Sequence, residues 1–166
     1  MNKHNFKPGK IENCQICFSS KLTKVMEIGD QPLANSLIKD LSKEGKYEKF
    51  PINIIRCEEC TLLQIDYIVD QTKVYHPEYP YLPGITKTVD NEQKELSDFL
   101  CKELDLNDND LVVDIGSNDG SLLKHFKSKG LKTIGVEPTN ISKIANENGI
   151  TTIQSFFNED ISSKIV

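Results

Sequence analysis

Short apolar runs alternate with amphipathic segments in the carboxyl-terminal half of the chain. The runs at 111–115 (LVVDI), 132–137 (KTIGVE) and 150–154 (ITTIQ) have the length of strands, and the first of them suits a strand buried on both faces. Helical patterns lie between these runs, at 121–130 and 141–148. This alternation predicts an α/β fold that contains the first half of a doubly wound, Rossmann-like sheet.

The amino-terminal half carries a different pattern. Residues 22–28 (LTKVMEI) and 50–57 (FPINIIRC) alternate and are rich in β-branched side chains, which is typical of strands. Residues 89–104 place three leucines and Phe99 on one side of a predicted helix. The two halves therefore have different secondary structure, with strands first and mixed elements afterwards.

A break in the pattern separates these halves. Pro83 and Gly84 lie between them, and both residue types interrupt helices and strands. Four of the five cysteines lie before residue 61. We expect a small domain at residues 1–84 and a second at residues 85–166.

Composition narrows the class of protein. The chain has 166 residues, of which 37% are hydrophobic and 27% charged, and this is ordinary globular composition. Its net charge of −5 argues against a partner that is nucleic acid, because such binding depends on Lys and Arg. No apolar run approaches the roughly 20 residues that cross a bilayer, and from the first residues we expect no signal peptide. We expect a cytoplasmic protein with no membrane partner.

The early cysteines form two pairs with metal-ligand spacing. Cys14 and Cys17 make one Cys-x-x-Cys motif, and Cys57 and Cys60 make another, with 39 residues between the pairs. Two thiolates on each tight turn hold one side of a tetrahedral zinc ion, so two such turns complete a four-sulfur site. Four sulfur ligands leave no open position for catalysis, and the predicted Zn²⁺ is therefore structural.

Three other interpretations of the paired cysteines are less favoured than a zinc site. Disulfides are disfavoured because nothing in the sequence marks an oxidising compartment. A redox pair of the thioredoxin type usually occurs once, at the start of a helix, and not as two distant pairs. Cysteines that only pack as small hydrophobic residues have no reason to fall in paired spacing.

A glycine-containing loop follows the run at 111–115 and has the position of a nucleoside-binding loop. It reads Gly-Ser-Asn-Asp-Gly and leads directly into the helical pattern at 121–130. In such folds the ligand binds at the carboxyl ends of the strands, where Glu137 is placed to accept hydrogen bonds from both ribose hydroxyls. The residues that we expect to bind a cofactor are Asp114, Gly116, Asn118, Asp119, Gly120 and Glu137. A plain turn between a strand and a helix is the simpler alternative.

Two cofactor classes fit a loop at this position. A dinucleotide such as NAD normally requires G-x-G-x-x-G, so that backbone amides can approach a pyrophosphate. Here the loop differs, and Asp119 within it would repel a pyrophosphate. S-adenosylmethionine carries no phosphate and has a cationic sulfonium and an amino group, which suit Asp114 and Asp119. The sequence favours the methyl donor.

Taken together, the motifs resemble those of the zinc-binding sugar C-methyltransferases, which build branched deoxysugars from nucleotide-linked keto sugars. The matching segments are the two cysteine pairs with Thr-Leu-Leu-Gln64 after the second, Gly29-Asp-Gln-Pro-Leu-Ala-Asn35, Tyr79-Pro-Tyr81, Ile115-Gly-Ser-Asn-Asp-Gly-Ser-Leu-Leu123 and Gly135-Val-Glu-Pro138. They follow the family's order across nearly all of residues 12–157.

The resemblance implies a reaction and roles for particular residues. The family methylates the carbon next to a keto group, so a base must remove a proton from that carbon and donors must stabilise the enolate oxygen. Tyr79 and Tyr81 match a tyrosine-rich segment that covers the family's substrate pocket, and they are the candidate catalytic residues. The implied substrate is a nucleotide-linked sugar.

The resemblance also bears on completeness. The family's general base and carboxyl-terminal domain lie beyond the position of Val166. We therefore expect this chain alone to show no methyl transfer, and a carboxyl-terminal partner chain is possible. The alternative function is a non-catalytic zinc-binding module, or the first half of a split enzyme. A zinc-ribbon protein that binds nucleic acid is disfavoured by the net charge.

Overall fold

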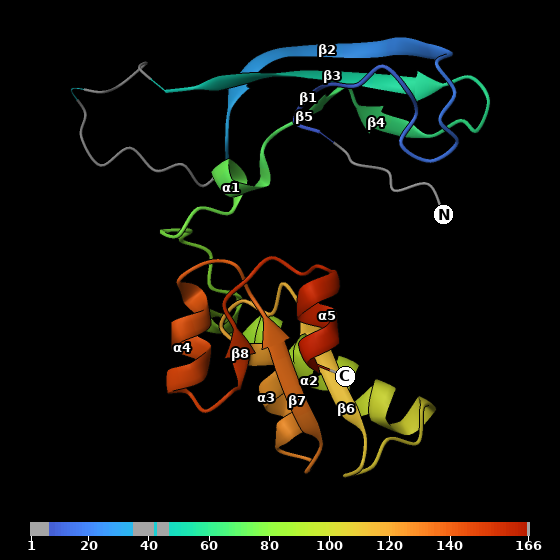
Figure 1. Ribbon diagram of the computed structural model, residues 1–166. Coiled ribbons are helices and arrows are strands. Elements are labelled where there is room, and N and C mark those ends of the chain that lie inside the picture. Colours follow the sequence, from blue (N-terminus) through green and yellow to red (C-terminus); the bar gives the residue numbers. More distant parts are fainter. Residues whose placement is uncertain (1–6, 35–41, 43–46, 166) are drawn as a thin grey trace. The chain divides into compact units, whose positions relative to one another are not determined.

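The chain divides into two compact units. The computed structural model describes residues 7–34, 42 and 47–165, and its contacts separate Met1–Val74 from Tyr75–Val166 (Figure 1). Both tyrosines of the Tyr79-Pro-Tyr81 motif therefore belong to the second unit, and the division lies before them. Asn35, the last residue of the Gly29–Asn35 motif, lies outside the described residues.

The first unit is built from short antiparallel strands. Its elements are β1 (Gly9–Lys10), β2 (Leu22–Pro32), β3 (Lys49–Cys57), β4 (Leu63–Ile65), β5 (Tyr67–Ile68) and the single-turn helix α1 (Gln71–Val74). Strands β2, β3 and β4 form one antiparallel sheet, and β1 pairs with β5. The strands predicted at 22–28 and 50–57 are confirmed as parts of β2 and β3.

Strand β2 is irregular. Its pairing with β3 shifts register between Lys24 and Met26 and again between Glu27 and Gly29, as a β-bulge does. Most of β2 is exposed, including the apolar side chains of Val25 and Ile28. Little of this strand therefore contributes to an apolar core.

The core of the first unit is small. Among its described residues, the buried hydrophobic side chains are Cys14, Phe50, Ile55 and Cys57. Two of these four belong to the paired-cysteine motifs. A unit with so little buried apolar surface needs another source of stability, and small domains commonly obtain it from a metal.

The second unit is an α/β layer structure. Its elements are the 3₁₀ turn η2 (Pro83–Ile85), α2 (Lys87–Glu103), β6 (Leu111–Ile115), α3 (Ser121–Lys127), β7 (Lys132–Val136), α4 (Ile141–Glu147), β8 (Thr152–Ile153) and α5 (Glu159–Ile165). Strands β6, β7 and β8 are parallel and adjacent in that order (Figure 1). The predicted strand, helix, strand alternation is confirmed, although α3 and β8 are shorter than the patterns that predicted them.

Helices α3 and α4 share one apolar core with the sheet. Leu123 of α3 and Ala145 of α4 are fully buried and pack with Ile150, and Val112 of β6 lies against them. These contacts pack α3 and α4 against the sheet. The loop between β6 and α3 lies at the carboxyl end of β6.

Helix α2 joins this layer through polar contacts. Its buried residue is Ser97, whose hydroxyl accepts a hydrogen bond from Lys129 Nζ at 2.6 Å. Asp90 lies 2.9 Å from His125 Nε2 on α3. The apolar side chains Leu96 and Phe99, predicted to lie on one side of this helix, are exposed in the described chain. The two polar contacts join α2 to α3 and to the residues that follow it. No helix in the described ranges has the length and apolar character that a membrane span requires.

One glycine of the sheet has no room for a side chain. A Cβ built on Gly135 in β7 would lie 2.9 Å from Ser117 Cβ and 2.8 Å from Thr152 Oγ1, and it would clash with Ser117 Oγ. Ser117 is almost fully buried, and in the described structure its hydroxyl has no hydrogen-bond partner. Gly135 thus lets the loop after β6 lie directly on β7.

This close approach predicts the effect of a methyl group. Gly135→Ala is expected to lower the free energy of unfolding by about 1–3 kcal/mol, the usual penalty for overpacking. Ser117→Gly in the same chain should restore part of that loss, because it removes two of the three clashing atoms. Urea denaturation measures both, with Lys132→Ala on the exposed part of β7 as the control. Equal stability of Gly135→Ala and the unaltered chain would contradict this packing.

Candidate functional site

The first cysteine pair sits on a tight turn. Cys14 N donates to Ser19 O at 2.8 Å, and Phe18 N donates to Cys14 O at 3.0 Å. Phe18 has a left-handed backbone with φ of 63°, which is uncommon for a residue other than glycine. The turn folds the chain back so that Cys14 and Cys17 project their sulfurs to the same side.

The second cysteine pair repeats this turn. Cys57 N donates to Leu62 O at 2.9 Å, and Thr61 N donates to Cys57 O at 3.0 Å. Thr61 is left-handed with φ of 64° and occupies the position equivalent to Phe18. Two matching turns from distant parts of the sequence therefore face one another, as the repeated spacing predicts.

The four sulfur atoms meet in one cluster. The Sγ atoms of Cys14, Cys17, Cys57 and Cys60 all lie within 4.8 Å of one another. Cys14 and Cys60 are 3.5 Å apart, and Cys17 and Cys57 are 3.4 Å apart. Zinc–sulfur bonds of about 2.3 Å in a tetrahedron place sulfurs about 3.8 Å apart, so the cluster has the size of a zinc site. The four residues fit Zn²⁺.

Backbone amides favour the thiolate form of one cysteine in each pair. A hydrogen bond from the Cys17 amide lowers the pKa of Cys14 to about 6. The Cys60 amide does the same for Cys57, whose pKa is also lowered. For Cys17 the Ser19 backbone lowers the pKa, but burial and the neighbouring thiols raise it to about 12. Neighbouring thiolates repel one another, and a divalent cation bound between them offsets that repulsion.

Gln64 links the first turn to β4. Its Oε1 accepts a hydrogen bond from Gln15 N at 3.1 Å, and Gln15 lies between the two cysteines of the first pair. Its Nε2 is buried with no hydrogen-bond partner in the part of the chain that the structure describes. In the sequence, Gln64 ends the Thr-Leu-Leu-Gln segment after the second cysteine pair, and its residue type alone indicates no role. Its position four residues after Cys60 was the available signal.

The loop after β6 has an unusual backbone. Gly116, Asn118 and Gly120 are all left-handed, with φ of 82°, 50° and 76°. Asparagine is one of the few residues other than glycine that adopt this conformation readily. The alternation folds the loop tightly, so that its amides point inward to protein acceptors.

Each backbone amide from residue 116 to residue 121 has an acceptor within the protein. Gly116 and Ser117 donate to Val136 O, Asn118 to Glu137 Oε2, Asp119 to Asn118 Oδ1, Gly120 to Ser117 O and Ser121 to Asp119 Oδ1, at 2.8–3.2 Å. A pyrophosphate-binding loop instead presents its amides to the ligand. This loop has no amide left for a phosphate in that stretch.

Two carboxyl groups lie at the ends of β6 and β7. Glu137 is only 5% exposed and accepts hydrogen bonds from Asn118 N at 3.1 Å and Thr139 N at 2.9 Å. Asp114 is partly buried, and this burial together with the charge of Glu137 raises the pKa of Asp114. Adjacent acids of this kind favour a cationic ligand, which relieves their repulsion.

The side chains of Asn118 and Asp119 are occupied within the protein. Asn118 Nδ2 donates to Tyr81 O at 2.9 Å, while Asp119 Oδ2 accepts from Gly84 N at 3.2 Å. The structure therefore brings the loop, Glu137 and the tyrosine segment together. The ring of Tyr79 lies 5.6 Å from that of Tyr75, and Tyr81 is 53% exposed.

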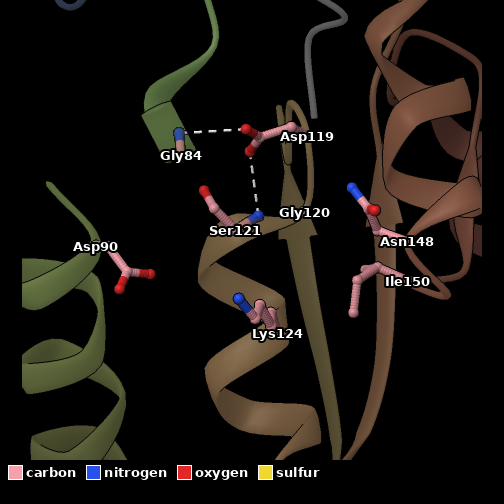
Figure 2. Close-up of a pocket in the computed structure, with 8 residues that line it drawn as sticks. All are labelled: Gly84, Asp90, Asp119, Gly120, Ser121, Lys124, Asn148 and Ile150. Carbon is pink, nitrogen blue, oxygen red and sulfur yellow. Dashed lines mark hydrogen bonds between the residues drawn. The ribbon is translucent and has the colours of Figure 1, made fainter. Parts of the chain in front are cut away.

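A cavity of about 310 Å³ adjoins the start of α3 (Figure 2). It is lined by Gly84, Asp90, Asp119, Gly120, Ser121, Lys124, Asn148 and Ile150. Asp119 and Gly120 are the expected cofactor residues among this lining, whereas Asp114 and Glu137 are not part of it. The expected cofactor residues thus divide between the strand ends and this cavity.

Removal of the metal is predicted to unfold the first unit. The purified chain should contain about one zinc, and a strong chelator should abolish its β-sheet circular dichroism while the helical signal of the second unit persists. Cys57→Ser should lose zinc, whereas Cys101→Ser, outside the cluster, should retain it. A first unit that keeps its unfolding transition after complete chelation would be inconsistent with this role.

The raised pKa of Asp114 predicts a pH-dependent cost to stability. Because the folded state holds this proton more tightly than the unfolded state does, stability is lost as the pH rises from the ordinary aspartate range through the folded pKa. Asp114→Asn should therefore stabilise the chain more at pH 7 than at pH 4. Urea unfolding at the two pH values tests this, with the exposed Asp108→Asn as a control. The same gain at both pH values would refute it.

The comparisons with known proteins agree with this arrangement. Residues 14–75 match the family model described as a putative zinc binding domain. The C-methyltransferase NovU of Streptomyces niveus is 28% identical over 156 residues, which is 93% of this chain. The chain spans 37% of the length of that curated relative. The domain match and the alignment together relate this chain to the amino-terminal portion of the zinc-binding C-methyltransferase family.

Proposed function

We propose that this chain provides the zinc-binding and cofactor-binding parts of an S-adenosylmethionine-dependent C-methyltransferase that acts on a nucleotide-linked keto sugar. The sequence similarity to a C-methyltransferase supports a role in the transfer of a methyl group to carbon. The match to a zinc-binding domain and the four-cysteine cluster support a structural metal in the first unit.

The internally satisfied loop is the observation that carries the choice of cofactor. All six amides from residue 116 to residue 121 are occupied, so a ligand bound there gains nothing from having phosphates. The neighbouring carboxyl groups of Asp114 and Glu137 favour positive charge. S-adenosylmethionine combines a cationic sulfonium, an amino group and a ribose, and the residues present fit it better than they fit NAD.

The chain's own residues then have distinct tasks. S-adenosylmethionine, when bound, supplies an electrophilic methyl group. Glu137 accepts hydrogen bonds from the ribose hydroxyls, and Asp114 offers a negative charge to the amino group or sulfonium. Tyr79 and Tyr81 orient the keto sugar, with their phenol hydroxyls as donors to an oxygen that gains negative charge when the adjacent carbon loses its proton. The zinc ion keeps the first unit folded and takes no part in the chemistry, because four sulfurs close its coordination.

Calorimetry with S-adenosylmethionine and with NAD tests the proposal. The chain should bind the former and not the latter. Glu137→Gln should weaken S-adenosylmethionine binding by about tenfold to a hundredfold, because hydrogen bonds to a charged acceptor are lost. Glu147→Gln on the exposed side of α4 is the matched control and should leave affinity unchanged.

Two outcomes would reject the proposal. Binding of NAD with an affinity similar to that of S-adenosylmethionine would show that phosphates are accepted after all. A zinc-loaded, folded chain that binds neither ligand would instead favour the alternative, a zinc-binding module whose task is to contact another protein. Melting curves recorded beside the titrations establish that each variant is folded.

A further inference from the structure

The segment that carries the tyrosines is fastened at three points. We call residues 77–84 the strap. Three hydrogen bonds join it to the loops that follow β6 and β7: Asn140 N to Pro77 O (3.2 Å), Asn118 Nδ2 to Tyr81 O (2.9 Å) and Gly84 N to Asp119 Oδ2 (3.2 Å). Tyr79 lies between the first two of these points. The strap therefore crosses from the loop after β7 to the loop after β6.

Asn118 is oriented for this contact by its own loop. Its Oδ1 accepts a hydrogen bond from Asp119 N at 2.8 Å, which turns its Nδ2 toward Tyr81 O. Its backbone is left-handed, with φ of 50°. Both polar atoms of this amide are thus engaged within the protein.

The far end of the strap lies tightly against the start of α3. A Cβ built on Gly84 would lie 2.7 Å from Asp119 Oδ2 and 3.1 Å from Ser121 Cβ. Figure 2 shows Gly84 facing the carboxylate of Asp119, which also accepts a hydrogen bond from Ser121 N at 3.2 Å. Asp119 therefore holds the strap and the first turn of α3 together.

From these contacts we infer that Asn118 is a positioning residue that holds the strap, and with it Tyr79 and Tyr81, across the carboxyl ends of β6 and β7, and that its side chain does not bind the cofactor. The part of the inference that concerns the substrate of Tyr79 and Tyr81 rests on the proposed function. The tether itself depends only on the hydrogen bonds above. Asn118 thereby couples the cofactor loop to the substrate side of the site.

Chymotrypsin provides a direct measurement of the tether. The enzyme cleaves after tyrosine and phenylalanine, but not where the next residue is proline. In the strap the Tyr79–Pro80 bond is therefore resistant, and the Tyr81–Leu82 bond is susceptible. The carbonyl that the protease attacks in that bond is the one that Asn118 holds. Asn118→Asp keeps the acceptor for Asp119 N but loses the donor, and Asn118→Gly keeps the left-handed backbone and loses both.

Both variants should be cut at Tyr81–Leu82 about three- to tenfold faster than the unaltered chain, because opening of the strap costs one hydrogen bond less. Cleavage at Phe99–Leu100 in α2, where Phe99 is exposed and lies outside the strap, should keep its rate and serves as the internal reference. Asn91→Asp on the exposed side of α2 adds the same charge away from the strap and should change neither rate. Mass spectrometry of the fragments gives both rates in one experiment.

An unchanged rate at Tyr81–Leu82 would overturn the inference, as would an equal acceleration at Phe99–Leu100, which indicates general loosening of the second unit. Calorimetry with S-adenosylhomocysteine separates the tether from cofactor binding. Asn118→Gly should bind it within about threefold of the unaltered chain, and a larger loss would make Asn118 a cofactor contact. If the unaltered chain binds no adenosyl ligand, the proposed function fails, and the cleavage pattern still decides the role of Asn118.

Discussion

The internal hydrogen bonding of the loop after β6 is the constraint on which the second unit depends. Buried backbone amides must be paired, and here Val136 O, the Glu137 carboxylate and the loop's own side chains pair them. This pairing requires left-handed residues in alternation and a glycine at position 135, so that the loop can lie on β7. The same pairing holds the Glu137 side chain in place at the edge of the sheet.

The first unit meets its equivalent constraint with sulfur. Its described residues bury few apolar side chains, and two of them are cysteines of the cluster. We expect metal binding and folding to be coupled there, because the cluster joins two turns that are 39 residues apart in sequence. The two units thus obtain their order from different interactions: a thiolate cluster in one, and a parallel sheet with packed helices in the other.

Most of the fold and the metal site could be predicted from local sequence patterns. Paired cysteine spacing predicted that four sulfurs converge, and the run LVVDI followed by a glycine loop predicted β6 and its turn. The roles of Asn118 and Asp119 were less accessible. Their residue types predict cofactor contacts, and the structure adds hydrogen bonds between both side chains and the backbone of residues 81–84 that the sequence did not indicate. Such contacts join segments that are 35 and 37 residues apart, and no local pattern encodes them.

The bulges of β2 have a consequence for how this protein behaves among other copies of itself. In the described part of the sheet β2 is an edge strand of eleven residues, with Val25 and Ile28 exposed beside its bulges. A long, straight, apolar edge invites strand addition from a neighbouring molecule. Two bulges within six residues bend that edge and break the regular row of amides that an incoming strand would need. The irregular register thus disfavours intermolecular strand pairing along this edge.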